Sequence, residues 1–142
     1  MKRIFLALIL LTLLLAGCTP SPDSKKDDDG VAIISYSDPI AENIVNGIKN
    51  RDYATFSKDF DEGLKTSIPE SSFGDILNLF DTKLGACSTY AITNAGITSH
   101  LPYAVYLLQC EKSAKGAYIK LVMDKETPHL LGGLWFDAAE LR

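Results

Sequence analysis

The sequence is poor in positive charge and lacks the motifs that mark common enzymes. Its 142 residues carry 14 Lys+Arg against 18 Asp+Glu, a formal net charge of −4. A nucleic-acid-binding protein needs a basic patch that neutralises phosphates, so this composition argues against that class. No HExxH, GxSxG or P-loop motif occurs, and no cluster of metal ligands stands out. We therefore expect neither a nucleic-acid partner nor a metal or organic cofactor.

Histidine is scarce as well, which limits acid–base catalysis. Only His100 and His129 are present. His100 stands among turn residues with no acidic residue near it in the sequence, which is typical of a solvated loop histidine. His129 has Asp124 and Glu126 close by, so a His–carboxylate dyad is one interpretation. A histidine at the edge of a turn, beside solubilising carboxylates, is the alternative.

A long hydrophobic run is absent too, and the one apolar stretch is too short to span a membrane. It extends from Ile4 to Leu15, after the positive Lys2 and Arg3. Twelve helical residues measure about 18 Å, against roughly 30 Å for the hydrocarbon core of a bilayer. Residues 1–17 therefore read as a signal peptide.

The end of this stretch, Leu15-Ala16-Gly17-Cys18, resembles the lipobox of prokaryotic lipoproteins. In that family a peptidase cuts before the cysteine, whose thiol carries a diacylglycerol. The resemblance implies a lipid on Cys18 and a domain held at the cell membrane or outer membrane, outside the cytoplasm. An ordinary secretory signal, or an uncleaved anchor with a chance cysteine, is the alternative. Thr19 follows the cysteine where an Asp would favour inner-membrane retention.

A flexible tether is expected next, over residues 18–30. No residue of this segment after Cys18 is apolar, so it cannot bury surface that would offset the entropy of ordering. Loss of residues 1–17 also removes two basic residues, which leaves the mature chain with a formal charge of −6. Residues 31–142 then form a single acidic domain.

Three helices are predicted in the first half of that domain. The first begins at Asp38-Pro39, since Asp is a good N-cap and Pro suits the first turn. Apolar residues then recur at helical spacing up to Ile48. Asp52 can cap a short second helix. The capping box Ser67-x-x-Glu70 predicts a third helix, which runs to a C-cap at Gly85.

After this third helix the apolar period changes from 3.6 to 2, which predicts strands. Turn residues separate four of them, over residues 86–95, 103–111, 117–124 and 129–136. Helices followed by an antiparallel meander indicate an α+β fold. The helices then pack on one face of a four-stranded antiparallel sheet.

Two cysteines test the pairing of the first two strands. If the hairpin turns at residues 98–99, Cys87 lies opposite Cys110. Opposed residues of antiparallel strands are close enough for a disulfide. With Cys18 lipidated, the remaining pair is even and lies in an oxidising compartment. A metal pair or redox thiols are the alternatives, but no CxxC spacing supports them.

The same arithmetic predicts which residues share the core face of the sheet. Ala91 is expected opposite Tyr106 across the first hairpin. A second turn near residues 114–115 then puts Tyr106 opposite Met123. We expect these residues on the face that the helices cover, and a partly wet surface on the other face.

The stretch from Ala41 to Leu64, centred on Asn50-Arg51-Asp52-Tyr53-Ala54-x-Phe56, resembles the opening of nuclear transport factor 2-like (cystatin-like) domains. The later helix, the meander and the closing Gly132-Gly133-Leu134-Trp135-Phe136 match the same plan, so the resemblance covers residues 38–137. It points to an uncharacterised bacterial and archaeal branch, often secreted or lipid-anchored. The fold it implies is a curved sheet that forms, with its helices, a cone whose open end can hold a small ligand.

Aromatic residues with polar tips are candidates for the wall of such a cone. The candidate pocket residues are Tyr53, Tyr106, Met123, His129 and Trp135, although Trp135 is equally suited to fill the core. We expect a non-catalytic envelope lipoprotein that binds a small ligand or a protein partner through the cone. The alternatives are a small isomerase or hydrolase built on the His129 dyad, and a structural protein that interacts through the exposed sheet face.

Overall fold

The structure, a computed structural model, describes residues 24–142, apart from the side chains of residues 24–28, 89 and 90. The predicted signal peptide, the lipid-attachment residue Cys18 and the start of the tether lie outside the described residues. The elements are, in chain order, α2 (Ser24–Asn50), α3 (Tyr53–Phe56), α4 (Glu62–Ser67), α5 (Glu70–Leu79), the π-helical turn η1 (Phe80–Leu84), β1 (Cys87–Thr98), β2 (Leu101–Cys110), β3 (Ser113–Met123), β4 (Leu131–Asp137) and the 3₁₀ turn η2 (Ala139–Leu141).

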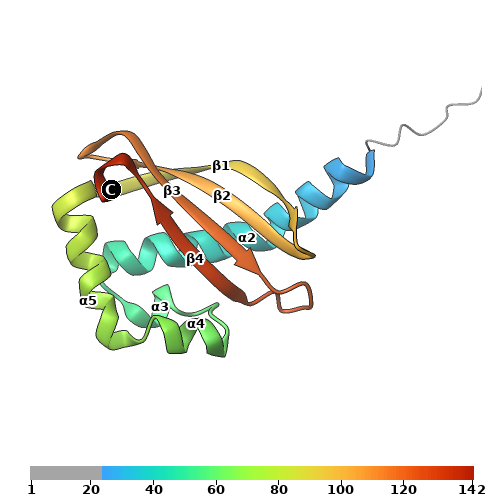
Figure 1. Cartoon of the computed structure of the whole chain (residues 1–142), viewed down its shortest axis with the longest axis horizontal. Coiled ribbons are helices and arrows are strands. Elements are labelled where there is room, and N and C mark those ends of the chain that lie inside the picture. The colour runs from blue at the N-terminus through green and yellow to red at the C-terminus, as the bar shows by residue number, and fades with distance from the viewer. Residues whose placement is uncertain (1–23) are drawn as a thin grey trace, which may run out of the picture.

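The α+β architecture is confirmed. The four strands form one antiparallel sheet in the order β1-β2-β3-β4, so each strand pairs with its neighbour in the sequence. The sheet is curved, and α2 runs along one face of it against β1 and β2, while α4 lies near β4 (Figure 1). None of the helices in the described part of the chain has an apolar stretch of membrane-spanning length.

The inner face of the sheet is buried against the helices. Tyr106, Leu108 and Ile119 are at most 1% exposed and alternate with outward-facing residues. Phe56 and Phe60, which follow α2 in the chain, pack edge to face with ring centroids 5.1 Å apart and are equally buried. This alternation is what a half-buried antiparallel sheet requires.

In the first hairpin the predicted register holds at the cysteine pair and is shifted in the residues that follow Cys87. Cys87 pairs with Cys110, as predicted, and the two sulfurs form a disulfide. A β-bulge between Cys87 and Thr89 then shifts the register by one residue, so the predicted pairing of Ala91 with Tyr106 is wrong and Ile92 takes that place. A second bulge follows between Ile92 and Asn94. Each bulge leaves one residue unpaired, and here the shift turns the larger apolar side chain toward the core.

The second hairpin turns earlier than predicted. Glu111-Lys112 forms the β2–β3 turn, so the expected turn near residues 114–115 is wrong, and those residues already belong to β3. Tyr106 consequently pairs with Ile119 and not with Met123. The displacement is four residues, an even number, so Met123 still faces the core.

The first helix begins well before its predicted start. α2 starts at Ser24 and continues through Pro39, so the prediction of a first turn at Asp38-Pro39 is wrong, and residues 24–30 of the expected tether are helical. Proline removes one hydrogen bond from a helix interior. The helix persists because both halves bury apolar side chains, including Ile33 before the proline and Ile40 after it.

The predicted capping box is wrong as well. Ser67 is the last residue of α4, a short helix that the sequence did not predict. α4 itself is capped by Asp61, whose carboxylate accepts a hydrogen bond from Leu64 N at 2.6 Å. α5, the helix that the capping box was expected to start, has Pro69 at its N-cap and no side-chain hydrogen bond there. The cap expected at Asp52 is confirmed, since its carboxylate accepts from Ala54 N at 3.0 Å.

Candidate ligand-binding site

The residues expected to line a pocket do not lie together. Tyr106 and Met123 are each 1% exposed and belong to the core. Trp135 is 54% exposed on the outer face of the sheet, so the sheet separates it from them. Tyr53 is half-buried, and its hydroxyl donates to the Ile68 carbonyl at 2.7 Å. Residue type alone did not indicate which aromatic side chains face inward.

The two histidines lie apart from carboxylate partners. His129 stacks on Tyr36, with ring centroids 4.0 Å apart, and its Nδ1 lies 3.1 Å from the backbone oxygen of Asp124. Among the side chains that the structure describes, no ion pair joins a histidine to a carboxylate. His100 is exposed in the turn between β1 and β2. The dyad of His129 with the carboxylate of Asp124 or Glu126 is therefore not formed.

Tyr36 and Asp52 have shifted pKa values for local reasons. Burial, and secondly the negative charge of Asp29, raises the pKa of the Tyr36 phenol. The hydrogen bond from the Thr55 hydroxyl, assisted by backbone N–H groups, lowers the pKa of Asp52. The first shift reflects a partly desolvated ring and the second a helix cap, so neither indicates a reactive site.

One buried polar cluster ties α2 to the sheet. The Tyr106 hydroxyl donates to Asp38 Oδ1 at 2.6 Å and lies 2.7 Å from the Ser37 hydroxyl. Ser37 is fully buried. Neither Tyr106 nor Asp38 lines the three best-formed cavities of the described part. The cluster therefore attaches the helix to the sheet and lies outside these three cavities.

The largest of these cavities lies where α2 ends, beside η1 and the disulfide, and we call it the end pocket. Its volume is about 360 Å³, which is within the range of small-molecule sites. The residues of its lining that the sequence had marked, among them Gly85 as a C-cap and Cys87 as a disulfide partner, were expected in other roles. Its lining combines apolar and charged side chains: Val45, Ile48, Lys49, Arg51, Phe80, Asp81, Gly85, Ala86, Cys87, Ser88, Leu108, Glu111 and Lys112.

A close crossing of α2 and α3 shapes one wall of the end pocket. A Cβ atom on Gly47 would lie 2.5 Å from backbone atoms of Phe56, so only glycine permits this approach. α2 then ends, Arg51 adopts a positive φ of 57°, and Asp52 N donates back to the Gly47 carbonyl at 2.8 Å. This chain reversal brings Arg51 to the mouth of the pocket.

A π-helical turn forms the opposite wall. α5 continues directly into η1, and Gly85, with a φ of 71°, ends the turn while its N–H donates to the Phe80 carbonyl at 2.8 Å. The C-cap predicted at Gly85 is thereby confirmed. The Thr82 hydroxyl donates to the Asn78 carbonyl at 2.7 Å. π-helical turns are rare in proteins, and those that occur are often found at functional sites.

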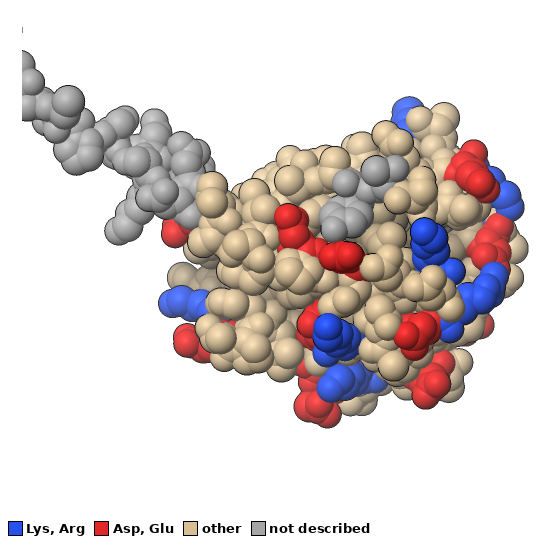
Figure 2. All heavy atoms as spheres, turned by 180° about the vertical axis from the view of Figure 1, so that it is seen from behind, with Lys and Arg blue, Asp and Glu red and all other residues tan. Residues whose placement is uncertain are grey.

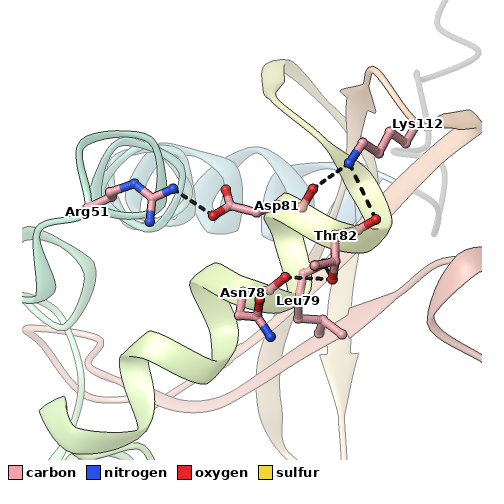
Figure 3. A network of polar contacts seen from close by, with 6 residues as sticks. All are labelled: Arg51, Asn78, Leu79, Asp81, Thr82 and Lys112. Carbon is pink, nitrogen blue, oxygen red and sulfur yellow. Dashed lines mark hydrogen bonds and ion pairs between the residues drawn. The ribbon is translucent and has the colours of Figure 1, made fainter.

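Charged side chains meet across the mouth of the end pocket (Figure 3). Arg51 Nη2 lies 2.6 Å from Asp81 Oδ2. Lys112 Nζ donates to the backbone oxygens of Asp81 and Thr82, at 2.6 and 3.5 Å, and so satisfies carbonyls at the end of the turn. Among the described residues Lys49 forms no ion pair and stays exposed.

The mouth carries a small excess of positive charge in an acidic protein. Lys49, Arg51 and Lys112 outnumber Asp81 and Glu111. Both carboxylates are engaged, Asp81 by the guanidinium and Glu111 by a backbone N–H at 3.3 Å. Figure 2 shows Lys, Arg, Asp and Glu side chains crowded together on the right of the molecule. An anionic group fits this mouth better than a cationic one.

The lining of the end pocket contains no histidine, and its one cysteine, Cys87, is held in the disulfide. No group of His, Cys, Asp and Glu side chains in the described part is arranged to hold a metal ion. No protein-family model, curated protein or solved structure matches this chain. The geometry of the pocket therefore carries the functional argument.

Proposed function

We propose that this protein is a non-catalytic lipoprotein of the cell envelope that binds a small amphipathic molecule in the end pocket. The observation that carries the proposal is a cavity of about 360 Å³ with apolar walls and three cationic side chains at its mouth. Ligand sites are typically of this size, mostly apolar, with a few polar groups that orient the ligand. The resemblance to nuclear transport factor 2-like domains supports the same assignment, because their cones hold small ligands.

The lining favours a ligand with an apolar body and one acidic group. Ile48, Ala86 and Cys87 offer exposed or half-buried apolar surface, on which a hydrocarbon gains free energy in proportion to the area it buries. Within the described residues the Arg51 guanidinium donates through Nη2 alone. Its remaining N–H groups are suited to the planar fork that a carboxylate accepts. Lys49 adds a second, unpaired cation.

The proposed lipid on Cys18 and the end pocket lie toward opposite ends of α2. α2 has 27 residues, so it is about 40 Å long. The end pocket lies at its C-terminal end, and the chain to Cys18 leaves from the other. A domain anchored in this way exposes the pocket to molecules of the compartment outside the cytoplasm.

Titration calorimetry with decanoate tests the ligand class. The chain from residue 18 onward, carrying Cys18→Ser, keeps every described residue and avoids detergent. We expect decanoate to bind, and decanol, which has the same apolar body without the charge, to bind about tenfold more weakly, because charge-assisted hydrogen bonds are lost. Equal affinities for decanoate and decanol would contradict the role of the cationic mouth.

Two tryptophan substitutions separate the end pocket from the rest of the surface. Ala86→Trp fills the pocket from its wall just before β1. Ala91→Trp places the same side chain at an exposed position of β1 outside the pocket. Decanoate binding should disappear in the first variant and persist in the second, with both folded by circular dichroism. Binding that survives Ala86→Trp would place the site elsewhere.

A second candidate function is an interaction protein that uses the outer face of the sheet. Trp135 and Tyr118 are 54% and 41% exposed there, and Lys120 Nζ lies 5.7 Å from the ring centroids of Trp135 and Tyr103. Exposed aromatic clusters are typical of interfaces. If this face is functional, Trp135→Ser abolishes cross-linking to a partner in the envelope and leaves decanoate binding unchanged.

A further inference from the structure

Three exposed apolar side chains gather at the end of the domain from which the tether leaves. Val31, Ile97 and Leu101 are 69%, 59% and 40% exposed. Val31 lies near the start of α2, and the other two flank the turn of the β1–β2 hairpin. Figure 1 shows the tip of this hairpin beside the first turns of α2. We call these three residues the tether-end patch.

A shallow groove makes the helix and the hairpin one surface. Its volume is about 130 Å³. Ile33 and Tyr36 line it from α2, and Ile97, His100 and Pro102 line it from the hairpin. Ile97 of the patch lines this groove, whose wall also carries the charged residues Asp29 and Lys125. The exposed apolar side chains therefore stand at a mixed surface formed by the helix and the hairpin together.

The length of the chain before α2 limits how far this surface can be from a lipid on Cys18. The six residues from Cys18 to Ser24 cover at most about 20 Å when extended. The helical residues from Ser24 to Val31 add about 10 Å. A lipid on Cys18 therefore keeps the tether-end patch within about 30 Å of the bilayer surface. The end pocket lies at the far end of α2.

We infer that the tether-end patch rests on the bilayer, with Val31, Ile97 and Leu101 inserted between the lipid headgroups. This inference rests on the proposed lipid attachment at Cys18. The acyl chains supply most of the membrane affinity, and the patch supplies a second contact that fixes how the domain stands. The end pocket then faces away from the membrane, toward ligands in solution.

The charges around the patch favour a neutral lipid surface. Asp29 and Lys125 line the groove, and Asp124 and Glu126 flank the lysine in the loop between β3 and β4. Carboxylates outnumber the cation, so anionic headgroups are repelled. The affinity of the patch for the bilayer then comes from the burial of apolar side chains, and not from attraction between basic residues and anionic lipids. Phosphatidylcholine is accordingly the lipid that fits.

Quenching of tryptophan by brominated acyl chains tests this contact. The full chain is expressed in bacteria, purified with its lipid and reconstituted into phosphatidylcholine vesicles with brominated or ordinary chains. Trp135→Phe removes the native tryptophan. Added to it, Ile97→Trp reports from the patch and Ala114→Trp from an exposed position at the far end of the sheet. We expect about twofold quenching for the Ile97→Trp variant and none for the Ala114→Trp variant.

Mass spectrometry of the purified protein separates the two ways in which the inference fails. A lipidated protein whose Ile97→Trp variant shows no quenching overturns the patch contact and leaves the anchor standing. A protein without lipid on Cys18 overturns the anchor, and the patch contact with it. Equal quenching of both variants overturns the proposed orientation, because the domain then lies flat on the bilayer.

Discussion

Tyr106 places a hydroxyl group inside the core, where Asp38 and Ser37 of α2 bond to it at 2.6 and 2.7 Å. A polar group buried at this depth needs partners, because its water is lost on folding. Both partners come from one helix, so the cluster fixes α2 on the sheet as well as satisfying the hydroxyl. Removing any one of the three side chains therefore takes a hydrogen bond away from at least one of the others.

The substitution Tyr106→Phe should lower the free energy of unfolding by about 1–3 kcal/mol, because it removes the phenol that bonds to the buried Ser37 hydroxyl and the half-buried Asp38 carboxylate. Urea denaturation measures this change. Tyr118→Phe is the control, since that side chain is 41% exposed, and should change the free energy by less than about 0.5 kcal/mol. Equal effects of the two substitutions would show that the buried cluster contributes nothing.

Asp52 makes the cap of α3 sensitive to pH. Its pKa lies below the usual 3.8, first of all because of the hydrogen bond from the Thr55 hydroxyl. A carboxylate with a depressed folded-state pKa stabilises the fold above its unfolded pKa and loses this effect as the pH falls through the folded pKa. Asp52→Asn keeps a capping oxygen without the charge.

Wild type should therefore be more stable than Asp52→Asn at neutral pH, and the difference should vanish by about pH 2. Denaturation at a series of pH values measures it. A difference that stays constant across the series would assign the effect to the shape of the side chain and not to its charge.

At the scale of elements, strand pairing was predictable from the sequence and strand register was not. Cys87 and Cys110 are an even pair at hairpin spacing, so their meeting follows from chemistry. The bulge that brings Ile92 opposite Tyr106 inserts a single residue and leaves no signal in the apolar pattern. The early start of α2 was hidden because Pro39 is typical of a first turn, and only burial on both sides of it shows otherwise.

Removal of the disulfide should destabilise the fold and damage the pocket together. The double substitution Cys87→Ala and Cys110→Ala opens the loop between two cysteines that are 23 residues apart. On the chain-entropy model this lowers the free energy of unfolding by about 3 kcal/mol. Decanoate affinity should fall too, because Cys87 lines the end pocket. Reducing agent should give wild type the stability of the double variant and leave that variant unchanged. A stability that reduction does not alter would contradict this account.

The crossing of α2 and α3 should tolerate no side chain at Gly47. Gly47→Ala puts a Cβ atom 2.5 Å from the Phe56 backbone, and overpacking of this kind costs about 1–3 kcal/mol. Gly74→Ala is the matched control, because no atom lies within 4 Å of its added Cβ and it sits inside α5. That variant should gain about 0.5–1 kcal/mol from helix propensity. Thermal denaturation tests this: a melting temperature below that of wild type for Gly47→Ala and above it for Gly74→Ala would confirm the close crossing.

At the scale of the whole molecule, α2 separates two surfaces of different character. The tether-end patch, with Val31, Ile97 and Leu101, lies at its start, and the end pocket lies where it finishes. The signal peptide and the lipid on Cys18 stay predictions, drawn from a local pattern of the sequence. The sequence could not indicate the pocket, whose lining comes from separate elements. Lys49 and Lys112 read in the sequence as ordinary surface lysines, and only the fold brings them to one mouth.

The most direct test of the central claim is the location of bound decanoate by nuclear magnetic resonance. The account predicts that titration shifts the backbone amide signals of Ile48, Ala86 and Leu108, which line the end pocket. Signals of Tyr118 and Trp135, on the outer face of the sheet, should stay in place. Shifts confined to the outer face, or no shifts at millimolar decanoate, would contradict a ligand site between α2, η1 and the disulfide.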